Sequence, residues 1–280
     1  MYMSLVAALL LQAQSAPTAQ VRTLTASIVD DKGAAVSGLT RDDLAVLENG
    51  VAREVASVDP DTRPLALALL VDTSQEIASE FRLHVIDALG EFLQKLPEGT
   101  RFTVWATGDR PTKLTDLGDD VPAAVTALRR AFLSGGNTLL DALIEATRDL
   151  KKEEGSRTAV VVVTGLTTNF SNRDRFTSAR EARSAADLFL AVQYQEGSAD
   201  NEARADYGYV LDTLTRQTGG LLEEPVSSMG VGAALQRLTS FLRSRYQIRY
   251  ATLSDVKDRK IQVQVARPGV KVQVTPPRQQ

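Results

Sequence analysis

The sequence contains no cysteine, and its 280 residues include a single histidine, His84. Disulfide bonds, thiol nucleophiles and zinc sites built from cysteine and histidine are therefore excluded. The net charge is −3 and no long run of lysine or arginine occurs, so the phosphate neutralisation that nucleic-acid binding requires is missing. No apolar run reaches the length of about 20 residues that a membrane-spanning helix needs. We therefore expect no nucleic-acid partner, no integral membrane span and no thiol chemistry.

The first 16 residues, MYMSLVAALLLQAQSA, contain an apolar core followed by small and polar residues. This order is typical of a secretory signal peptide, although the basic residue that normally precedes the core is missing. We expect a signal peptide over residues 1–16 and export to the periplasm or the extracellular space. The alternative is an uncleaved apolar terminus on a cytoplasmic protein.

The N-terminal part of the chain has the period of two that is typical of β-strands. Polar and apolar residues alternate over residues 21–30, and Asn49-Gly50 separates two further apolar-rich segments. Asn-Gly in this position is a strong hairpin signal, because both residues tolerate a positive φ. This part of the chain is predicted to be β.

The period of two returns after Arg245 and predicts three more strands, with a turn over residues 254–258. Neither terminal set of strands offers much core by itself. We therefore expect residues 17–62 and 245–280 to pack together as one smaller, discontinuous all-β module.

The centre of the chain, residues 63–244, alternates apolar strands with amphipathic helices. Leu65–Val71 and Ala159–Val163 are continuous apolar runs, as expected for strands that are buried on both faces of a parallel sheet. Helical periodicity follows over residues 81–96 and 138–152. The alternation predicts an α/β fold with a doubly wound, mostly parallel, Rossmann-like sheet.

Polar side chains follow the predicted strands at the points where they end. Asp72 and Ser74 come directly after Leu65–Val71, Thr138 opens a helix after a Gly-Gly-Asn loop, and Thr164 follows Ala159–Val163. Ligands of open α/β sheets bind at the carboxyl ends of the strands, so these oxygens are expected to converge there. A cluster that is rich in oxygen and lacks sulfur and imidazole suits a hard cation such as Mg²⁺ or Mn²⁺.

Several segments resemble the von Willebrand factor A (vWA) family, and most closely the bacterial VWFA-related proteins. LLVDTSQE is similar to the family's first metal loop and GGNTLLDAL to its second, while RKIQVQVARPGVKVQV is similar to the closing strands. SIVDDKGAAVSGLTRDDLAVLENGVAREV resembles the N-terminal β segment of the VWFA-related group. The resemblance spans most of the chain. It implies a vWA domain over residues 63–244 and a non-enzymatic module that binds or adheres to a protein.

The resemblance also implies a metal-ion-dependent adhesion site. The family uses Asp-x-Ser-x-Ser, a threonine from the second loop and an aspartate from a third, and the matching residues here are Asp72, Ser74 and Thr138. Glu76 stands in place of the second serine, as a possible substitute ligand, and Gly165 stands in place of the third-loop aspartate. The implied site is therefore degenerate, with weak or absent binding of Mg²⁺ or Mn²⁺. In the family, an acidic residue of the partner completes the coordination.

Simpler explanations exist for the same residues. Thr138 and Asp141 fit the Thr-x-x-Asp pattern of a helix cap, and Asp72 and Ser74 are placed to cap a helix that begins near Ile77. Under this interpretation the residues stabilise helix ends and bind no ion.

Two other functions compete with metal-dependent adhesion. One is a metal-independent scaffold or interaction protein, whose arginine-bearing stretch over residues 173–183 contacts an acidic partner or forms a solvated helix face. The other is a phosphate- or nucleotide-handling enzyme, because Gly135-Gly136 precedes a helix. The established phosphate-binding and nucleophile-elbow motifs are absent, and His84 has no recognisable catalytic partner, so catalysis is disfavoured.

Overall fold

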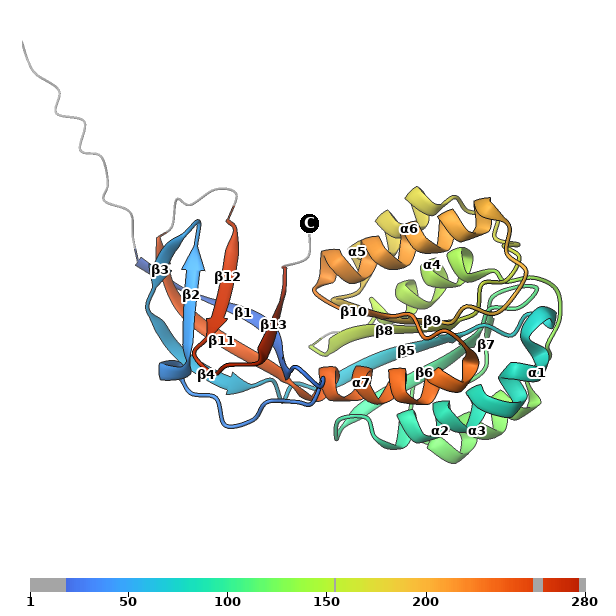
Figure 1. The fold of residues 1–280 in the computed structure, drawn as a ribbon, viewed down its shortest axis with the longest axis horizontal. Helices are drawn as coiled ribbons and strands as arrows, with labels where there is room; N and C mark the ends of the chain where they lie inside the picture. The colour runs from blue at the N-terminus through green and yellow to red at the C-terminus, as the bar shows by residue number, and fades with distance from the viewer. Residues whose placement is uncertain (1–18, 154, 254–258, 277–280) are drawn as a thin grey trace, which may run out of the picture.

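The computed structural model describes residues 19–153, 155–253 and 259–276, which form two lobes (Figure 1). The larger lobe contains a six-stranded sheet with helices on both faces, and the smaller lobe contains antiparallel strands. The fold class is therefore the predicted one. The expected signal peptide over residues 1–16 and the expected turn over residues 254–258 lie outside the described residues.

The six-stranded sheet has the order β10-β9-β8-β5-β6-β7. Every neighbouring pair is parallel except β6 and β7. The two short outer strands, β7 and β10, were not predicted from the sequence, because two or three residues are too few to show a period. The strands are β5 (Leu65–Val71), β6 (Thr100–Ala106), β7 (Thr112–Lys113), β8 (Arg157–Thr164), β9 (Leu188–Gln193) and β10 (Leu221–Glu223).

Helices cover both faces of this sheet (Figure 1). One face packs against α2 (Ile86–Gln94), α3 (Val121–Arg130) and α7 (Val231–Arg243). The other packs against α4 (Leu139–Leu150), α5 (Arg175–Ala185) and α6 (Asn201–Thr218). The helix predicted over residues 81–96 is less regular than expected. It follows a 3₁₀ turn (Gln75–Ile77) and the short α1 (Ala78–Glu80), and it starts as a π-helical segment (Phe81–Val85).

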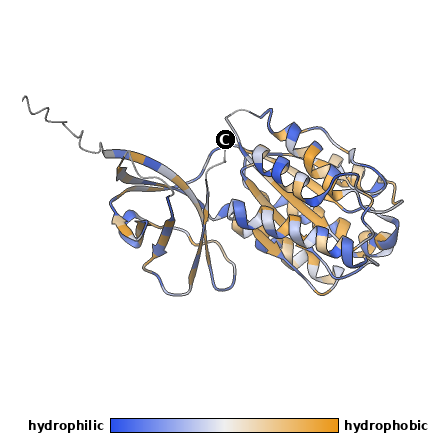
Figure 2. Cartoon of the chain, turned by 90° about the horizontal axis from the view of Figure 1, so that it is seen from above, coloured by the Kyte–Doolittle hydropathy of each residue, from blue (hydrophilic) through white to orange (hydrophobic). Residues whose placement is uncertain are grey.

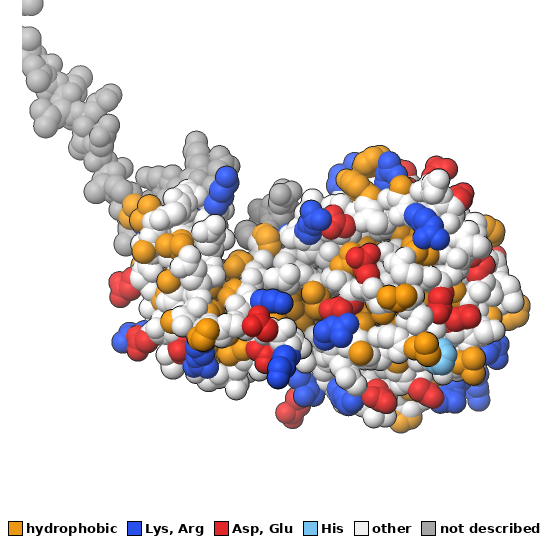
Figure 3. All heavy atoms as spheres, viewed as in Figure 1, with side chains coloured by type: hydrophobic (Ala, Val, Ile, Leu, Met, Phe, Trp, Pro, Cys, Tyr) orange, Lys and Arg blue, Asp and Glu red, His pale blue; other side chains and the backbone are white. Residues whose placement is uncertain are grey.

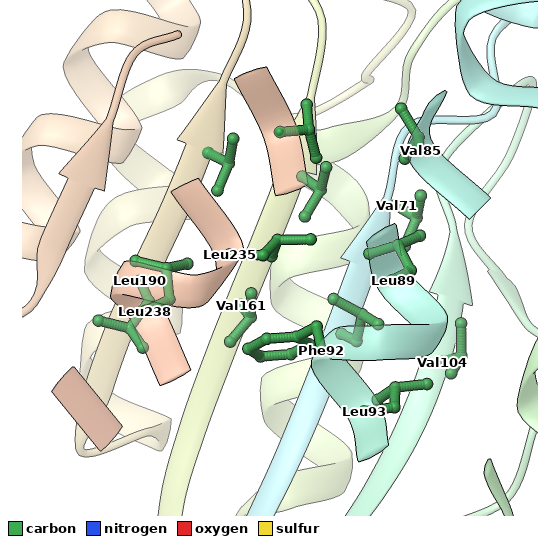
Figure 4. Packing of buried hydrophobic residues seen from close by; sticks show 14 of the residues in the cluster. Val71, Val85, Leu89, Phe92, Leu93, Val104, Val161, Leu190, Leu235 and Leu238 are labelled. Carbon is green, nitrogen blue, oxygen red and sulfur yellow. The ribbon is translucent and has the colours of Figure 1, made fainter. Parts of the chain in front are cut away.

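Strand β5 shows why a sheet with two covered faces gives a continuous apolar run. All seven of its residues are buried. Leu67 and Leu69 belong to the core under α2 and α7, whereas Ala66, Ala68 and Leu70 belong to the core under α4 and α6. The first of these cores includes Leu89 and Phe92 of α2 together with Leu235 and Leu238 of α7 (Figure 4). Figure 2 shows the apolar strands enclosed between helices whose outer surfaces are more polar.

The smaller lobe is built from both ends of the chain, as predicted. Its four-stranded sheet has the order β13-β1-β11-β4, and its three-stranded sheet has the order β12-β2-β3. Asn49 and Gly50 connect β2 to β3 with φ values of 51° and 79°, the conformation that the Asn-Gly hairpin requires. The strands are β1 (Ala19–Asp30), β2 (Leu44–Glu48), β3 (Val51–Arg53), β4 (Val55–Pro60), β11 (Arg245–Leu253), β12 (Ile261–Val265) and β13 (Val270–Thr275).

A shared core joins the two small sheets. Ala26 and Ile28 of β1, Val46 of β2 and Ile248 of β11 are fully buried in one cluster. A backbone hydrogen bond connects the lobes where the chain crosses between them, from Ile28 N of β1 to Ser244 O after α7 at 3.0 Å. No helix among the described residues combines the length and the apolar character needed to cross a membrane.

Candidate functional site at the carboxyl edge of the sheet

Asp72 is the centre of a hydrogen-bond network at the carboxyl edge of the six-stranded sheet. Its side chain is buried, and Oδ1 accepts a hydrogen bond from the backbone N–H of Ser74 at 2.9 Å. Oδ2 has four neighbouring donors. These are Asn137 Nδ2 at 2.9 Å, Thr164 Oγ1 at 3.1 Å, the Gly165 N–H at 3.2 Å and Thr167 Oγ1 at 2.8 Å.

The parallel strands bring these donors together, because their carboxyl ends lie at one edge of the sheet. Asp72 N donates to Val163 O of β8 at 2.9 Å, and Thr107 N, just after β6, donates to Val71 O at 3.0 Å. The loop before α4 joins them through Ser134 N, which donates to Thr73 O at 3.2 Å. The three loops therefore converge as the sequence predicted.

Burial raises the pKa of the Asp72 carboxyl above its ordinary value. The hydrogen bonds from Ser74, Thr167 and Thr164 oppose this shift because they stabilise the charged form. The network thus uses neutral hydroxyl, amide and backbone donors to accommodate a buried acid.

Ser74 and Thr138 also lie at this edge, and both are buried. Thr138 Oγ1 donates to Thr107 O at 2.8 Å, and Ser74 Oγ has no hydrogen-bond partner within the described structure. Neither side chain caps a helix. Asp141, the other half of the expected cap, instead accepts from the backbone N–H groups of Asn172 and Arg173. The helix-cap explanation of these residues was therefore wrong.

Comparison with known proteins agrees with this arrangement. The sequence pattern of the von Willebrand factor type A domain matches residues 67–167, which include most of β5, all of β6 and β8, and Asp72, Asn137 and Thr164 of the converging loops. The chain contains a von Willebrand factor type A domain. No curated protein sequence matches the chain.

Solved structures share the fold at low sequence identity. A von Willebrand factor type A protein from Catenulispora acidiphila superposes with a TM-score of 0.56 at 10% identity, over 93% of this chain and 73% of that one. Proximal thread matrix protein 1 from the mussel byssus, described with a zinc-occupied MIDAS motif, superposes with a TM-score of 0.54 at 14% identity. That match covers 70% of this chain and only half of the mussel protein.

Glu76 of the vWA domain accepts hydrogen bonds from two neighbouring loops. Its Oε1 accepts hydrogen bonds from the backbone N–H and the hydroxyl of Thr168, and its Oε2 accepts from the N–H and hydroxyl of Ser198 at 2.8 and 2.6 Å. Burial raises the pKa of this carboxyl, but the bonds from Ser198 and Thr168 outweigh burial and lower the pKa to about 2. Glu76 therefore connects the loop after β5 to the loops after β8 and β9.

Gly165 is the residue that the family resemblance aligns with the third-loop aspartate, and the structure leaves no room for a side chain there. A Cβ added to Gly165 would lie 2.7 Å from Glu196 O and 3.1 Å from the Cγ2 of Ile77. A side chain at this position would therefore require the neighbouring backbone to move.

These residues are a poor fit for a divalent cation. Mg²⁺ and Mn²⁺ require several oxygen ligands in a strict geometry, including at least one carboxylate that is free to coordinate. Asp72 already accepts hydrogen bonds on both oxygens, and Glu76 is engaged elsewhere. The described residues contain no group of three or more histidines and acids that could hold a metal ion.

Sequence reasoning missed three members of the network. Asn137 donates to Asp72 and accepts from the Thr107 hydroxyl at 2.7 Å, Thr167 donates to Asp72, and Ser198 binds Glu76. Asn137 stands directly before Thr138, so its position in the second loop was visible. Thr167 and Ser198 had no sequence signal, because their loops approach only in the folded chain.

Proposed function

We propose that the carboxyl edge of the vWA sheet is a non-enzymatic surface that binds a protein partner and does not require a metal ion. A vWA domain is in general an adhesion or protein-interaction module. The Asp72 network supports the metal-independent form of this function, since its hydrogen-bond donors perform the stabilising role that a cation would otherwise have.

Two exposed phenylalanines carry the proposal. Phe132 is 84% exposed and lies two residues before Ser134, and Phe170 is 52% exposed in the loop after β8. Phe170 is held at the edge because its N–H donates to Asn137 O at 2.8 Å and its ring fills the space where a Gly136 side chain would lie. Exposed aromatic side chains that the surrounding structure holds in place are typical contact points of protein interfaces. We refer to Phe132 and Phe170 as the aromatic pair.

The contacts of Ser74 and His84 support a non-catalytic role. Ser74 Oγ has no general base within hydrogen-bonding distance among the described residues. His84 is exposed on the π-helical segment, beside a groove between α2 and α7 that includes Met229, and it is visible on the face shown in Figure 3. An activated serine needs an adjacent base, so hydrolysis through Ser74 is disfavoured.

The organisation of the chain belongs to the same proposal. We assign residues 1–16 to an export signal, residues 63–244 to the vWA domain, and residues 17–62 with 245–280 to the β module that carries it. An acidic partner residue, which a cation-bearing site would need, has no role here. The contact is expected to centre on the aromatic pair.

A cross-linking experiment tests the proposal. A photoreactive amino acid at position 170 of the full chain would capture partners in an extract of the source organism, and each recovered partner would be purified and titrated. The Phe132→Ala/Phe170→Ala double variant should bind at least about tenfold more weakly, since interface aromatics each contribute on the order of 1–2 kcal/mol.

The control is Leu83→Ala, which removes an equally accessible apolar side chain next to the α2–α7 groove. This variant should bind like the unmodified protein, and binding should persist in chelator. If chelator abolishes binding, the site is metal-dependent. If Leu83→Ala alone weakens binding, the partner uses the helix face, and in either case the proposal fails.

A further inference from the structure

A cavity lies at the edge of the vWA sheet opposite to the candidate site, at the amino ends of its strands. It has a volume of about 350 Å³ and is bounded by the starts of β5, β8 and β9 on one side and by β1, β11 and β13 on the other. The cavity therefore lies between the two lobes. Its volume is within the range of small-molecule sites.

The polar part of this cavity is rich in guanidinium groups. Arg157 and Arg245 line it as buried residues, and Arg22 of β1 and Arg63 line it from exposed positions. We call these four residues the arginine cluster. They come from both lobes and from four separate parts of the chain. Arg259 also lines the cavity, but it forms an ion pair with Glu48 at 3.1 Å.

Arg245 is buried, with 6% of its surface exposed, and it has no carboxylate within 4 Å among the described residues. Its hydrogen-bond partners are the neutral hydroxyls of Ser27 at 3.3 Å and Thr275 at 3.0 Å. Burial and the neighbouring charge of Arg157 lower the pKa of Arg245 to about 10. A buried cation that has only neutral partners is costly unless an anion compensates it.

The acids in and beside the cavity, Asp187 of its lining and the neighbouring Asp61, do not balance the arginine cluster. Asp61 forms a two-pronged ion pair with Arg63 at 2.8 Å and is shared with Arg157 at a longer 3.8 Å. Asp187 is the other acid, and it accepts hydrogen bonds from the N–H and hydroxyl of Thr158. Arg22 forms no ion pair with a described residue. The cluster therefore has four positive charges against two negative ones.

The remaining wall combines hydroxyl-bearing side chains with a group of aliphatic ones. Leu65 and Leu188 lie at the starts of β5 and β9, Leu242 is near the end of α7, and Leu24 and Val274 come from the smaller lobe. A ligand that fills this cavity thus contacts guanidinium groups on one part of its surface and aliphatic side chains on another.

We propose that the cavity between the lobes binds a small organic anion, with a carboxylate or phosphate head among the arginine cluster and a short aliphatic body against the leucine wall. Guanidinium groups are suited to both head groups, because their N–H donors match the geometry of two oxygens. The site is distinct from the carboxyl edge, and the proposal is independent of protein binding there.

Calorimetric titration of the full chain with octanoate tests this site, with octyl phosphate as a second probe. A single saturable site is expected for at least one of the two, and the stronger probe identifies the head group. Two kinds of control should bind at least about tenfold more weakly. Acetate and inorganic phosphate lack the aliphatic chain, and octanol lacks the negative charge.

Arg22→Ala is the test variant, because Arg22 is exposed and its loss should leave the fold intact. It should weaken binding of the better probe by about tenfold, the effect of losing one charge-assisted hydrogen bond. Arg130→Ala removes an exposed arginine of α3 outside the cavity and should leave binding unchanged. The proposal is overturned if neither probe binds at millimolar concentration, if octanol binds as well as the anions, or if Arg22→Ala binds like the unmodified protein.

Discussion

The side-chain amide of Asn137 donates to Oδ2 of Asp72 at 2.9 Å, although 65 positions separate the two residues in the chain. The same amide contacts Thr164 Oγ1 at 2.9 Å, and the Asn137 carbonyl oxygen accepts from Thr107 Oγ1 at 2.7 Å. One buried side chain thus connects the ends of three neighbouring strands, β5, β6 and β8.

Replacing Asn137 with alanine should destabilise the protein by about 3 kcal/mol, because buried partners on three loops lose hydrogen bonds together. Urea denaturation measures the change in the free energy of unfolding. Asn172→Ala, at an exposed position, is the control and should remain within about 0.5 kcal/mol. An Asn137 variant as stable as the control would show that the network contributes nothing to the fold.

Glu76→Gln should cost stability at neutral pH and progressively less at acid pH. The folded-state pKa of Glu76 is about 2, below its ordinary value of 4.5, so the ionised carboxylate stabilises the fold above pH 4.5. That contribution is lost as the pH falls from 4.5 towards 2. Urea unfolding at pH 7, 4 and 2.5 should show a difference between the two proteins that shrinks in that order.

The matched control for Glu76 is Glu145→Gln on the exposed side of α4. Glu145 has no ion pair within the described structure, and its substitution should change the free energy of unfolding by less than about 0.5 kcal/mol at pH 7. A difference for Glu76→Gln that grows towards low pH would contradict the hydrogen bonds assigned to Thr168 and Ser198.

Addition of 10 mM Mg²⁺ or Mn²⁺ should leave the melting temperature of the full chain within about 1 °C of its value in chelator. A ligand that binds only the folded state at 100 times its Kd adds about 2.7 kcal/mol, which a melting curve detects readily. A metal-dependent rise in the melting temperature that disappears in Asp72→Ala would show that a cation binds at Asp72. That result would refute the metal-independent proposal.

Gly165→Ala should destabilise the vWA domain by about 2 kcal/mol, because the added methyl group meets Glu196 O at 2.7 Å. Gly208→Ala makes the same chemical change in the interior of α6, where no atom beyond the chain neighbours and the backbone of the helix itself lies within 4 Å of the new Cβ. That variant should stabilise the protein by about 0.5–1 kcal/mol through helix propensity. Equal melting temperatures for the two variants would show that the loop after β8 moves to make room for the added methyl group at position 165.

Local sequence patterns predicted much of the fold, because the spacing of apolar residues reflects which side chains are buried. Leu65–Val71 is apolar without interruption and forms β5 with those bounds, and Asn49-Gly50 forms the expected turn. The stretch over residues 173–183 shows the limit of this reasoning. Arg173 and Arg180 are exposed as a solvated helix face requires, whereas Arg183 is buried.

The sequence alone determined the strand–helix alternation, the pairing of the two chain ends in one β module and the presence of Asp72 where a buried strand stops. Those features follow from periodicity and from the need to bury apolar surface. The tertiary structure alone decided that Glu76 turns to Thr168 and Ser198, that Asn137 contacts Asp72, and that Arg245 lies buried between the lobes. A side chain's partners depend on which loops approach it in the folded chain. Local sequence patterns do not show which loops, far apart in the sequence, come close together.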